Sequence, residues 1–318
     1  MQALYLDKNG LSLKTNLKRP APRRGSSLVR VTLAGVCATD LELKKGYMGF
    51  NGIPGHEFVG AVEGPTSSPF LGKRVVGDIN ISCGKCGYCN TGFKNHCPNR
   101  SVLGILGRNG AFAEYLTLPN ENLHIVPSNV TDEEAVFTEP LAAAFEITKQ
   151  VKLSNNDSVA VLGDGKLGLL TALALNLTDA RLTAIGKHPE KLKILNDAGI
   201  RTLTFGKRPI TEKFDITVDC TGSKSGINAA LSMTKPAGKV ILKTTVAGER
   251  TVDLNKLVID EITVIGSRCG PFDVALDALK KKRINVAPLI DSIYPLENGI
   301  AALKRAERKG VLKVLIRP

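Results

Sequence analysis

Four cysteines crowd into fifteen residues of this chain: Cys83, Cys86, Cys89 and Cys97. Two, two and seven residues separate successive thiols, and glycines between them provide tight turns. Closely spaced thiolates on such turns suit tetrahedral zinc, and four of them leave no open position, so we predict a structural zinc site. An iron–sulfur cluster is an alternative, because Pro98 follows Cys97 as in the bacterial ferredoxin pattern, although the last gap differs. Buried or disulfide-bonded cysteines are the other alternative, but an odd total of seven cysteines does not suggest a disulfide framework.

A second pattern, G-x-G-x-x-G, is formed by Gly163, Gly165 and Gly168, directly after an apolar run and at the start of a helical pattern. These glycines allow a tight turn, close approach of a pyrophosphate and close packing of helix on strand, with the phosphates on free N–H groups. An ordinary glycine-rich turn is the alternative reading. The predicted dinucleotide-binding residues are Gly163, Asp164, Gly165, Lys166, Leu167, Gly168, Gly186, Lys187, His188 and Thr221.

The end of the following strand-like run distinguishes NAD from NADP. An NAD site has Asp or Glu there, which binds the ribose 2′-hydroxyl. This chain has Gly186, Lys187 and His188 instead, so the sequence shows no carboxylate at that position to repel a 2′-phosphate, and Lys187 and protonated His188 would attract one. We therefore predict NADP(H) in preference to NAD(H); the alternative is that Lys187 is a solvated loop charge.

The elements that must position these residues change character along the chain. The first ~145 residues hold short strand-like runs separated by Gly and Pro turns, which predicts a β-rich domain. From residue 158, strand-like runs alternate with helical patterns, which predicts a doubly wound parallel sheet. The strand-like runs there are Ser158–Leu162, Arg181–Ile185, Asp215–Asp219, Lys239–Lys243 and Glu261–Ile265. The helical ones are Lys166–Leu177, Pro189–Ala198 and Ser225–Thr234, and two further helices are predicted at Phe272–Lys282 and Leu296–Arg308, before a last strand at Val311–Ile316.

Composition narrows the class of protein. The chain has 318 residues, 43% hydrophobic and 23% charged, which fits a folded protein of about two domains. The longest apolar run is too short to cross a bilayer, and Met1 to Leu6 alternates like a first strand, with no signal-peptide core, so we expect a cytoplasmic protein without a membrane partner. The net charge of +13 permits nucleic-acid binding, but the cations are scattered and Trp is absent, so no nucleic-acid partner is predicted.

Several motifs occur in an order that resembles a known family. They are Gly35-Val-Cys37-Ala-Thr39-Asp40, Gly55-His56-Glu57, the four-cysteine lobe, Glu139-Pro140-Leu-Ala, the Gly163–Gly168 loop and Ile265-Gly-Ser-Arg268. Together they resemble the zinc-dependent medium-chain dehydrogenase/reductase family, in its polyol, threonine and glucose dehydrogenase branch. Zinc-free quinone reductases share that fold, but the relatives compared lack this ligand set and lobe.

The resemblance covers essentially the whole chain and implies an α/β protein of two domains. A GroES-like, β-rich catalytic domain would comprise residues 1–146 and 268–318, with the structural zinc lobe at 80–100. A Rossmann dinucleotide-binding domain would comprise residues 147–267. Family members suggest a homodimer or a homotetramer.

The resemblance also implies a second, catalytic zinc. Its ligands would be Cys37, His56 and Glu139, with Glu57 as an alternate or fourth ligand, and Asp40 would orient His56. The small-molecule substrate would be an alcohol, namely a polyol, sugar, hydroxy amino acid or secondary alcohol. Its hydride would pass to the nicotinamide ring to give the aldehyde or ketone, while Thr39 accepts the proton.

Other readings of these residues remain open at this stage. Singly, Cys37 reads as a small buried hydrophobe, His56 as a core histidine and Glu139 as an anion at a helix start. Many relatives have a His where this chain has Glu42, which leaves the proton exit open. A catalytically retired scaffold that senses NADPH or binds nucleic acid is the alternative function.

Overall fold

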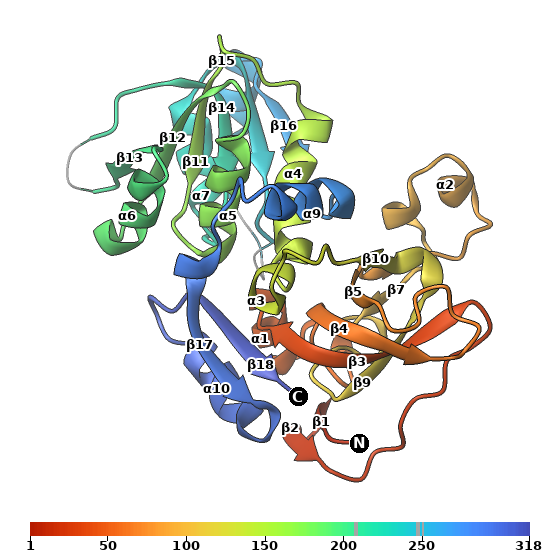
Figure 1. The fold of residues 1–318 in the computed structure, drawn as a ribbon. Helices are drawn as coiled ribbons and strands as arrows, with labels where there is room; N and C mark the ends of the chain where they lie inside the picture. The colour runs from red at the N-terminus through yellow and green to blue at the C-terminus, as the bar shows by residue number, and fades with distance from the viewer. Residues whose placement is uncertain (207–208, 246–248, 250) are drawn as a thin grey trace. The chain divides into compact units, whose positions relative to one another are not determined.

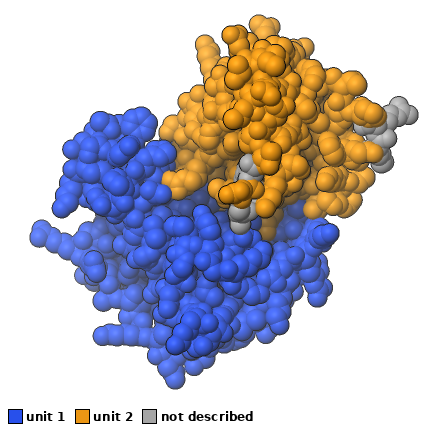
Figure 2. All heavy atoms as spheres, turned by 180° about the vertical axis from the view of Figure 1, so that it is seen from behind, with its two compact units in different colours: residues 1–139, 272–318 blue, residues 140–271 orange. Residues whose placement is uncertain are grey.

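The computed structural model describes residues 1–206, 209–245, 249 and 251–318. The chain forms two compact units, coloured separately in Figure 2. Unit 1 is residues 1–139 together with 272–318, and unit 2 is residues 140–271. None of the helices within the described ranges is both long enough and apolar enough to cross a membrane.

Unit 1 is built on a seven-stranded sheet (Figure 1). Its strands are β3 (Ser26–Gly35), β4 (Glu57–Gly64), β5 (Arg74–Gly77), β9 (Tyr115–Pro119), β10 (Leu123–Ile125), β17 (Ile290–Pro295) and β18 (Lys313–Arg317). They lie in the order β10-β5-β4-β3-β18-β17, and β9 also pairs with β3. The long strand β3 therefore hydrogen-bonds to β4, β9 and β18, so residues from both ends of the chain meet along it.

Smaller elements complete unit 1. A hairpin is formed by β1 (Ala3–Asp7) and β2 (Gly10–Lys14), and a three-stranded sheet by β6 (Asn80–Ile81), β7 (Ser101–Leu103) and β8 (Gly107–Arg108). Its α-helices are α1 (Ala38–Lys44), α2 (Gly87–Asn90), α3 (Asp132–Ala135), α9 (Phe272–Lys280) and α10 (Gly299–Ala306). Its 3₁₀ turns are η1 (Tyr47–Gly49), η2 (Lys94–His96), η3 (Asn120–Asn122), η4 (Ala287–Leu289) and η5 (Leu296–Asn298). Thr131 and Glu134 form a reciprocal capping box at the start of α3, as S/T-x-x-E sequences do.

Unit 2 holds a six-stranded sheet whose strand pairings are all parallel within the described residues. Its strands are β11 (Ser158–Leu162), β12 (Arg181–Gly186), β13 (Arg201–Thr204), β14 (Phe214–Asp219), β15 (Thr234–Leu242) and β16 (Thr263–Gly266). The order β13-β12-β11-β14-β15-β16 places the first strand between the second and the fourth, which is the strand order of a Rossmann fold. The helices are α4 (Thr138–Gln150, whose first two residues belong to unit 1), α5 (Lys166–Leu175), α6 (Pro189–Asp197), α7 (Gly226–Met233) and α8 (Leu254–Ile259).

The predicted fold class is confirmed: the protein is α/β, with a β-rich unit and a doubly wound parallel sheet. Short apolar strands fill the core of unit 2, where Val159, Val161 and Val218 are fully buried. Continuous burial on both faces is typical of parallel strands covered by helices. In a doubly wound sheet, a ligand binds beyond the carboxyl ends of the two strands between which the strand order reverses. Here those two strands are β11 and β14.

Candidate active site

The four-cysteine lobe brings its thiols together. The sulfur of Cys86 lies 3.4 Å from that of Cys89 and 3.7 Å from that of Cys97, while Cys83 and Cys89 are 4.0 Å apart. Four thiolates at about 2.3 Å from one zinc ion would be about 3.8 Å apart, so the set fits tetrahedral zinc. All four cysteines are free thiols, and a hydrogen bond from the Lys85 backbone lowers the pKa of Cys83 to about 6.

A second set of donors gathers in unit 1. Donor atoms of Cys37, His56 and Glu57 all lie within 4.8 Å of one another. Strands β3 and β4 lie side by side (Figure 1), and Gly35 at the end of β3 pairs with Glu57 at the start of β4. Cys37 follows β3 and His56 precedes β4, so both lie at the same end of the strand pair. A side chain at Gly35 would collide with Glu57, so glycine at that position leaves room for the carboxylate. A thiolate, an imidazole and a carboxylate form a ligand set suited to catalytic zinc.

Asp40 organises this set from the first turn of α1. The Cys37 N–H donates to Asp40 Oδ2 at 2.8 Å, and the Gly55 N–H donates to Asp40 Oδ1 at 3.2 Å. His56 Nδ1 lies 3.3 Å from the same Oδ1, which leaves its other ring nitrogen for a metal. Burial alone would lower the pKa of His56, but the Asp40 carboxylate and the Cys37 thiolate raise it well above its usual value.

Lys313, on strand β18, forms a buried ion pair with Glu57. The two side chains are 2% and 1% exposed, and the ammonium also lies 5.6 Å from the centre of the Phe137 ring. Desolvation lowers the pKa of Lys313, but Glu57 and the nearby Cys37 and Glu139 outweigh it and keep that pKa above its ordinary value. Glu57 thus already has a cationic partner.

Glu139 lies near the donor set but outside the three-residue group. The residue is half-buried, yet its carboxyl group is desolvated, which raises its pKa to about 7. The charges of His56 and Lys313 lower that pKa and the charge of Glu57 raises it, so all three groups are close by. A buried carboxyl group beside a thiol and an imidazole is stabilised in its ionised form by a cation. Glu139 therefore fits as a further zinc ligand, although the structure does not gather it as closely as Glu57.

The predicted proton-transfer residue Thr39 lies beside the donors. Its Oγ1 is 3.8 Å from the Cys37 sulfur. Glu42, in contrast, accepts a hydrogen bond of 2.8 Å from Lys45 on the exposed side of α1. Thr39 thus lies next to the donor set, whereas Glu42 is engaged by a surface cation.

The glycine-rich loop of unit 2 has the geometry that its sequence predicts. Gly163 adopts φ 111°, and Gly165 is the N-cap of α5, of which Lys166 and Leu167 are the first residues. A Cβ on Gly168 would overlap the Gly163 carbonyl group, so glycine is required where helix and strand meet. Thr221, after β14, donates its hydroxyl to Asp219 at 2.7 Å.

The end of strand β12 has a neighbour that its own sequence does not show. The sequence shows no carboxylate at the end of β12, but the structure places one there, from Asp164. The Lys187 and His188 N–H groups donate to Asp164 Oδ2 at 2.6 and 2.7 Å. Residues of the glycine loop and of the strand end form one cluster, which sequence spacing did not indicate.

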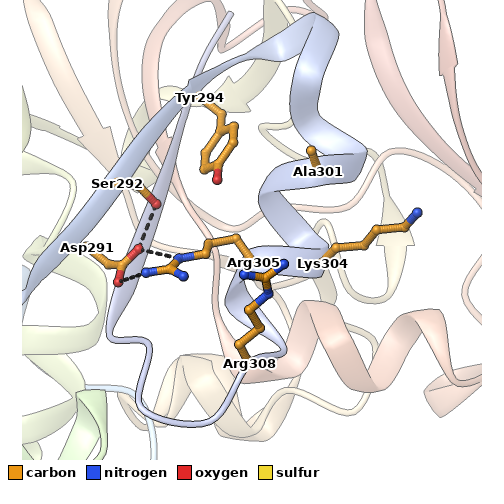
Figure 3. Close-up of a pocket in the computed structure, with 7 residues that line it drawn as sticks. All are labelled: Asp291, Ser292, Tyr294, Ala301, Lys304, Arg305 and Arg308. Atoms are coloured by element: carbon orange, nitrogen blue, oxygen red, sulfur yellow. Dashed lines mark hydrogen bonds and ion pairs between the residues drawn. The ribbon is translucent and has the colours of Figure 1, made fainter.

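The structure also has a cavity of about 430 Å³ between β17 and α10. Figure 3 shows the Arg305 guanidinium paired with Asp291 on its wall. The lining residues are Asp291, Ser292, Tyr294, Ala301, Lys304, Arg305 and Arg308, none of which is a thiol or an imidazole. This cavity is therefore distinct from the metal-ligand set.

Lys313 is the site residue that sequence reasoning missed. It lies in the predicted strand Val311–Ile316, where a single lysine interrupts an otherwise apolar run. A lone charge in an apolar strand indicates a buried partner, and that signal was available in the sequence. The identity of the partner, Glu57, was not, because 256 residues separate the two.

Comparison with known proteins identifies the family. Residues 23–128 match the model of the alcohol dehydrogenase GroES-like domain, and residues 167–281 match that of the zinc-binding dehydrogenases. A sorbitol dehydrogenase from Halalkalibacterium halodurans is 27% identical over all of this chain and 99% of its own length. An L-threonine 3-dehydrogenase from Chelativorans sp. is 30% identical over 78% of each chain.

Solved structures of similar proteins support the same family. A crystal structure described as a short chain alcohol dehydrogenase (rspB) from E. coli CFT073 with NADH has a TM-score of 0.91 and 27% identity, covering 100% of this chain and 99% of that one. A zinc-binding dehydrogenase from Sinorhizobium meliloti 1021 bound to NADP has a TM-score of 0.90 and 26% identity with the same coverage. The chain belongs to the zinc-binding medium-chain alcohol dehydrogenase family, in the branch of the polyol and threonine dehydrogenases. It is a zinc-dependent alcohol or polyol dehydrogenase that uses a nicotinamide dinucleotide.

Proposed function

We propose that this dehydrogenase transfers a hydride between a hydroxyl-bearing carbon of a polyol, sugar, hydroxy amino acid or secondary alcohol and NADP(H), with the aldehyde or ketone as product. The observation that carries the proposal is the convergence of Cys37, His56 and Glu57 from two strands of one sheet, with Asp40 behind the imidazole. The names of the relatives, sorbitol dehydrogenase and L-threonine 3-dehydrogenase, support this range of substrates.

For the catalytic zinc we propose Cys37, His56 and Glu139 as ligands, with Glu57 as the alternate or fourth. Lys313 already neutralises Glu57, whereas the pKa of Glu139 is raised to about 7 by desolvation. A divalent cation would stabilise the ionised form of Glu139, which is desolvated, more than that of Glu57, which already has a cationic partner. The lobe cysteines Cys83, Cys86, Cys89 and Cys97 would hold the second, structural zinc.

The chain's own residues divide the work of the reaction. Asp40 holds the Cys37 backbone and the His56 ring in place, and it fixes the ring nitrogen that faces away from the metal. Thr39 would act as a proton relay: its Oγ1 accepts the alcohol proton while its own hydroxyl proton passes on toward solvent. When bound, zinc lowers the pKa of an alcohol hydroxyl group and the nicotinamide ring takes up the hydride.

The dinucleotide is proposed to bind at the glycine-rich loop. Gly163, Gly165, Lys166, Leu167 and Gly168 would receive the pyrophosphate, with Asp164 between the first two glycines and Thr221 after β14 also lining the dinucleotide site. NADP(H) is favoured because Lys187 supplies an ammonium group for a 2′-phosphate.

The test is a Cys37→Ser variant of the full chain. We expect bound zinc to fall from two ions to one per chain and NADP-linked alcohol oxidation to be lost, while the affinity for NADPH stays unchanged. A Cys97→Ser variant is the matched control, because it removes a thiol from the lobe and should also reduce zinc to one ion while leaving Cys37 and its neighbours intact. Full turnover by Cys37→Ser would contradict the proposed ligand set.

We also propose that two or more copies associate through unit 2. Strand β16 is at the edge of the parallel sheet, and Val264 on it is 38% exposed. Helix α8 exposes Leu254, Val258 and Ile259, of which the last two are 75% and 78% exposed. Within the described residues β16 pairs with β15 alone, and an open strand edge in a unit that also exposes apolar side chains favours association with a second chain. Light scattering should give the mass of a dimer or tetramer, and Val258→Asp should lower it.

A further inference from the structure

Asp164, the residue between the first two glycines of the loop, has an unusual position for an acid. Its side chain is 10% exposed and turns toward the end of β12 rather than into solvent. Asp164 Oδ2 accepts the N–H groups of Lys187 and His188, and both carboxylate oxygens lie 3.1 Å from His188 Nδ1. The glycine loop and the strand end are thus joined through one carboxylate.

That carboxylate occupies the space of a missing side chain. A Cβ on Gly186 would lie 2.5 Å from Asp164 Oδ2 and 2.6 Å from Asp164 Cβ. An acid at 186 could not coexist with Asp164 in this arrangement, so Gly186 is required by packing. In doubly wound dinucleotide domains, an acid at this strand end hydrogen-bonds the adenosine ribose. Here the same volume holds an acid that comes from a different part of the chain.

The carboxylate has acceptor capacity left for a ligand. Oδ2 takes the two backbone N–H groups, whereas Oδ1 contacts only the His188 ring among the hydrogen bonds of the described residues. A carboxylate oxygen has two lone pairs, so Oδ1 retains one for a ribose hydroxyl group. Burial raises the pKa of Asp164, but the hydrogen bonds from His188 and Lys187 outweigh it and hold that pKa below its ordinary value, so the group stays ionised at neutral pH.

Charge of the opposite sign lies next to it. Lys187 follows Gly186 directly, and its ammonium group is 5.8 Å from the centre of the Phe205 ring. His188 is 45% exposed and shares the carboxylate of Asp164. A 2′-phosphate at this strand end would be attracted by Lys187 and repelled by Asp164. A free 2′-hydroxyl would instead donate a hydrogen bond to Asp164, and Lys187 would not change its binding.

We infer that Asp164 is a specificity-determining residue, which gives the ribose subsite a hydroxyl acceptor in place of the strand-end acid and so admits NAD(H) alongside NADP(H). Lys187 is its counterpart, which favours the phosphorylated dinucleotide. This inference rests on the proposed function, because it concerns the dinucleotide of the same reaction. It predicts a site that binds both dinucleotides, in which Asp164 favours NAD(H) and the neighbouring Lys187 favours NADP(H).

The experiment measures binding, not turnover. NADH and NADPH are titrated separately into the zinc-loaded full chain, and binding is followed by the fluorescence of the reduced nicotinamide, which absorbs and emits at longer wavelengths than the protein. The wild-type dissociation constants should lie within about tenfold of each other. Asp164→Asn keeps the shape and an oxygen acceptor but removes the charge, and it should raise the NADPH-to-NADH affinity ratio about tenfold. Lys187→Gln should lower that ratio by a similar factor.

Asp157→Asn is the matched control. Asp157 is an acid of the same unit that accepts the Ser154 N–H and hydroxyl; it lies at the opposite end of β11 from the glycine loop, so its loss should leave the ratio unchanged. If Asp164→Asn weakens both dinucleotides equally, the acid only braces the loop and the inference is overturned. A selective loss of NADPH affinity would also overturn it, since Asp164 would then serve the phosphate by holding His188. Failure of the wild type to bind either dinucleotide would instead overturn the proposed function itself.

Discussion

Replacing Lys313 with methionine would test the most enclosed charge pair of unit 1. Methionine matches the length of the lysine stem but removes the ammonium group, which leaves Glu57 as an unpaired acid that is 1% exposed. Breaking a buried ion pair by removing one partner costs about 3–5 kcal/mol. With a urea dependence of about 2 kcal/mol per molar, the unfolding midpoint of unit 1 should fall by roughly 1.5–2.5 M.

Tyrosine fluorescence follows unit 1 selectively. The chain has five tyrosines and no tryptophan, and all five lie in unit 1, at Tyr5, Tyr47, Tyr88, Tyr115 and Tyr294. The double variant Glu57→Gln/Lys313→Met removes both charges and should recover more than half of the lost midpoint, because no charge is then left buried without a partner. A shift of less than about 0.5 M in Lys313→Met, or a double variant as unstable as the single one, would refute the view that the pair is tightly coupled.

Three further changes have expected outcomes. Gly168→Ala should abolish dinucleotide binding and cost unit 2 about 1–3 kcal/mol by calorimetry, because its Cβ would overlap the Gly163 carbonyl group; unchanged binding would contradict the close helix–strand contact. Dialysis against a chelator, followed by limited proteolysis, should produce cleavage within residues 80–100, since the lobe depends on metal for its order; an uncut lobe would argue that it folds without zinc. Asp215→Asn should cost about 1 kcal/mol at pH 7, allowing for the 34% exposure of this acid. Desolvation raises the pKa of Asp215, but hydrogen bonds from Ser158 and the charge of Lys235 outweigh it and lower that pKa to about 2. The difference in unfolding free energy between wild type and Asp215→Asn should therefore shrink as the pH falls from about 4 to 2. A free-energy difference that stays constant over that range would show that the charge of Asp215 is not its origin.

Much of the fold follows from local sequence pattern. The strand expected at Ser158–Leu162 is β11 to the residue, and the helix expected at Lys166–Leu177 is α5, which ends two residues earlier. Strands β13 and β17 were not predicted, because each holds charged or polar residues at an edge of its sheet rather than an apolar run. Edge strands bury little side-chain surface, so their pairing depends on neighbours that sequence alone does not place.

The candidate site was predicted only in part, for a related reason. The glycine spacing and the cysteine spacing are local, so both motifs could be read directly. The contact between Glu57 and Lys313 depends on β18 pairing with β3, and the contact between Asp164 and Lys187 depends on β12 lying beside β11. In both cases a parallel or returning strand brings together groups that are far apart in sequence, and the identity of each partner comes only from topology.

The discontinuity of unit 1 has a consequence for biosynthesis. Residues 140–271 form a contiguous unit, and their sheet can assemble as soon as they leave the ribosome. Strand β3 gains its pairing with β18 only after residue 313 has been made, so Glu57 awaits its cation throughout synthesis of the intervening unit. At 5–20 residues per second, the roughly 250 residues between them correspond to a delay of about 12–50 s. During that interval a nascent chain exposes the incomplete sheet edge of β3, and the ion pair of Glu57 with Lys313 is completed last.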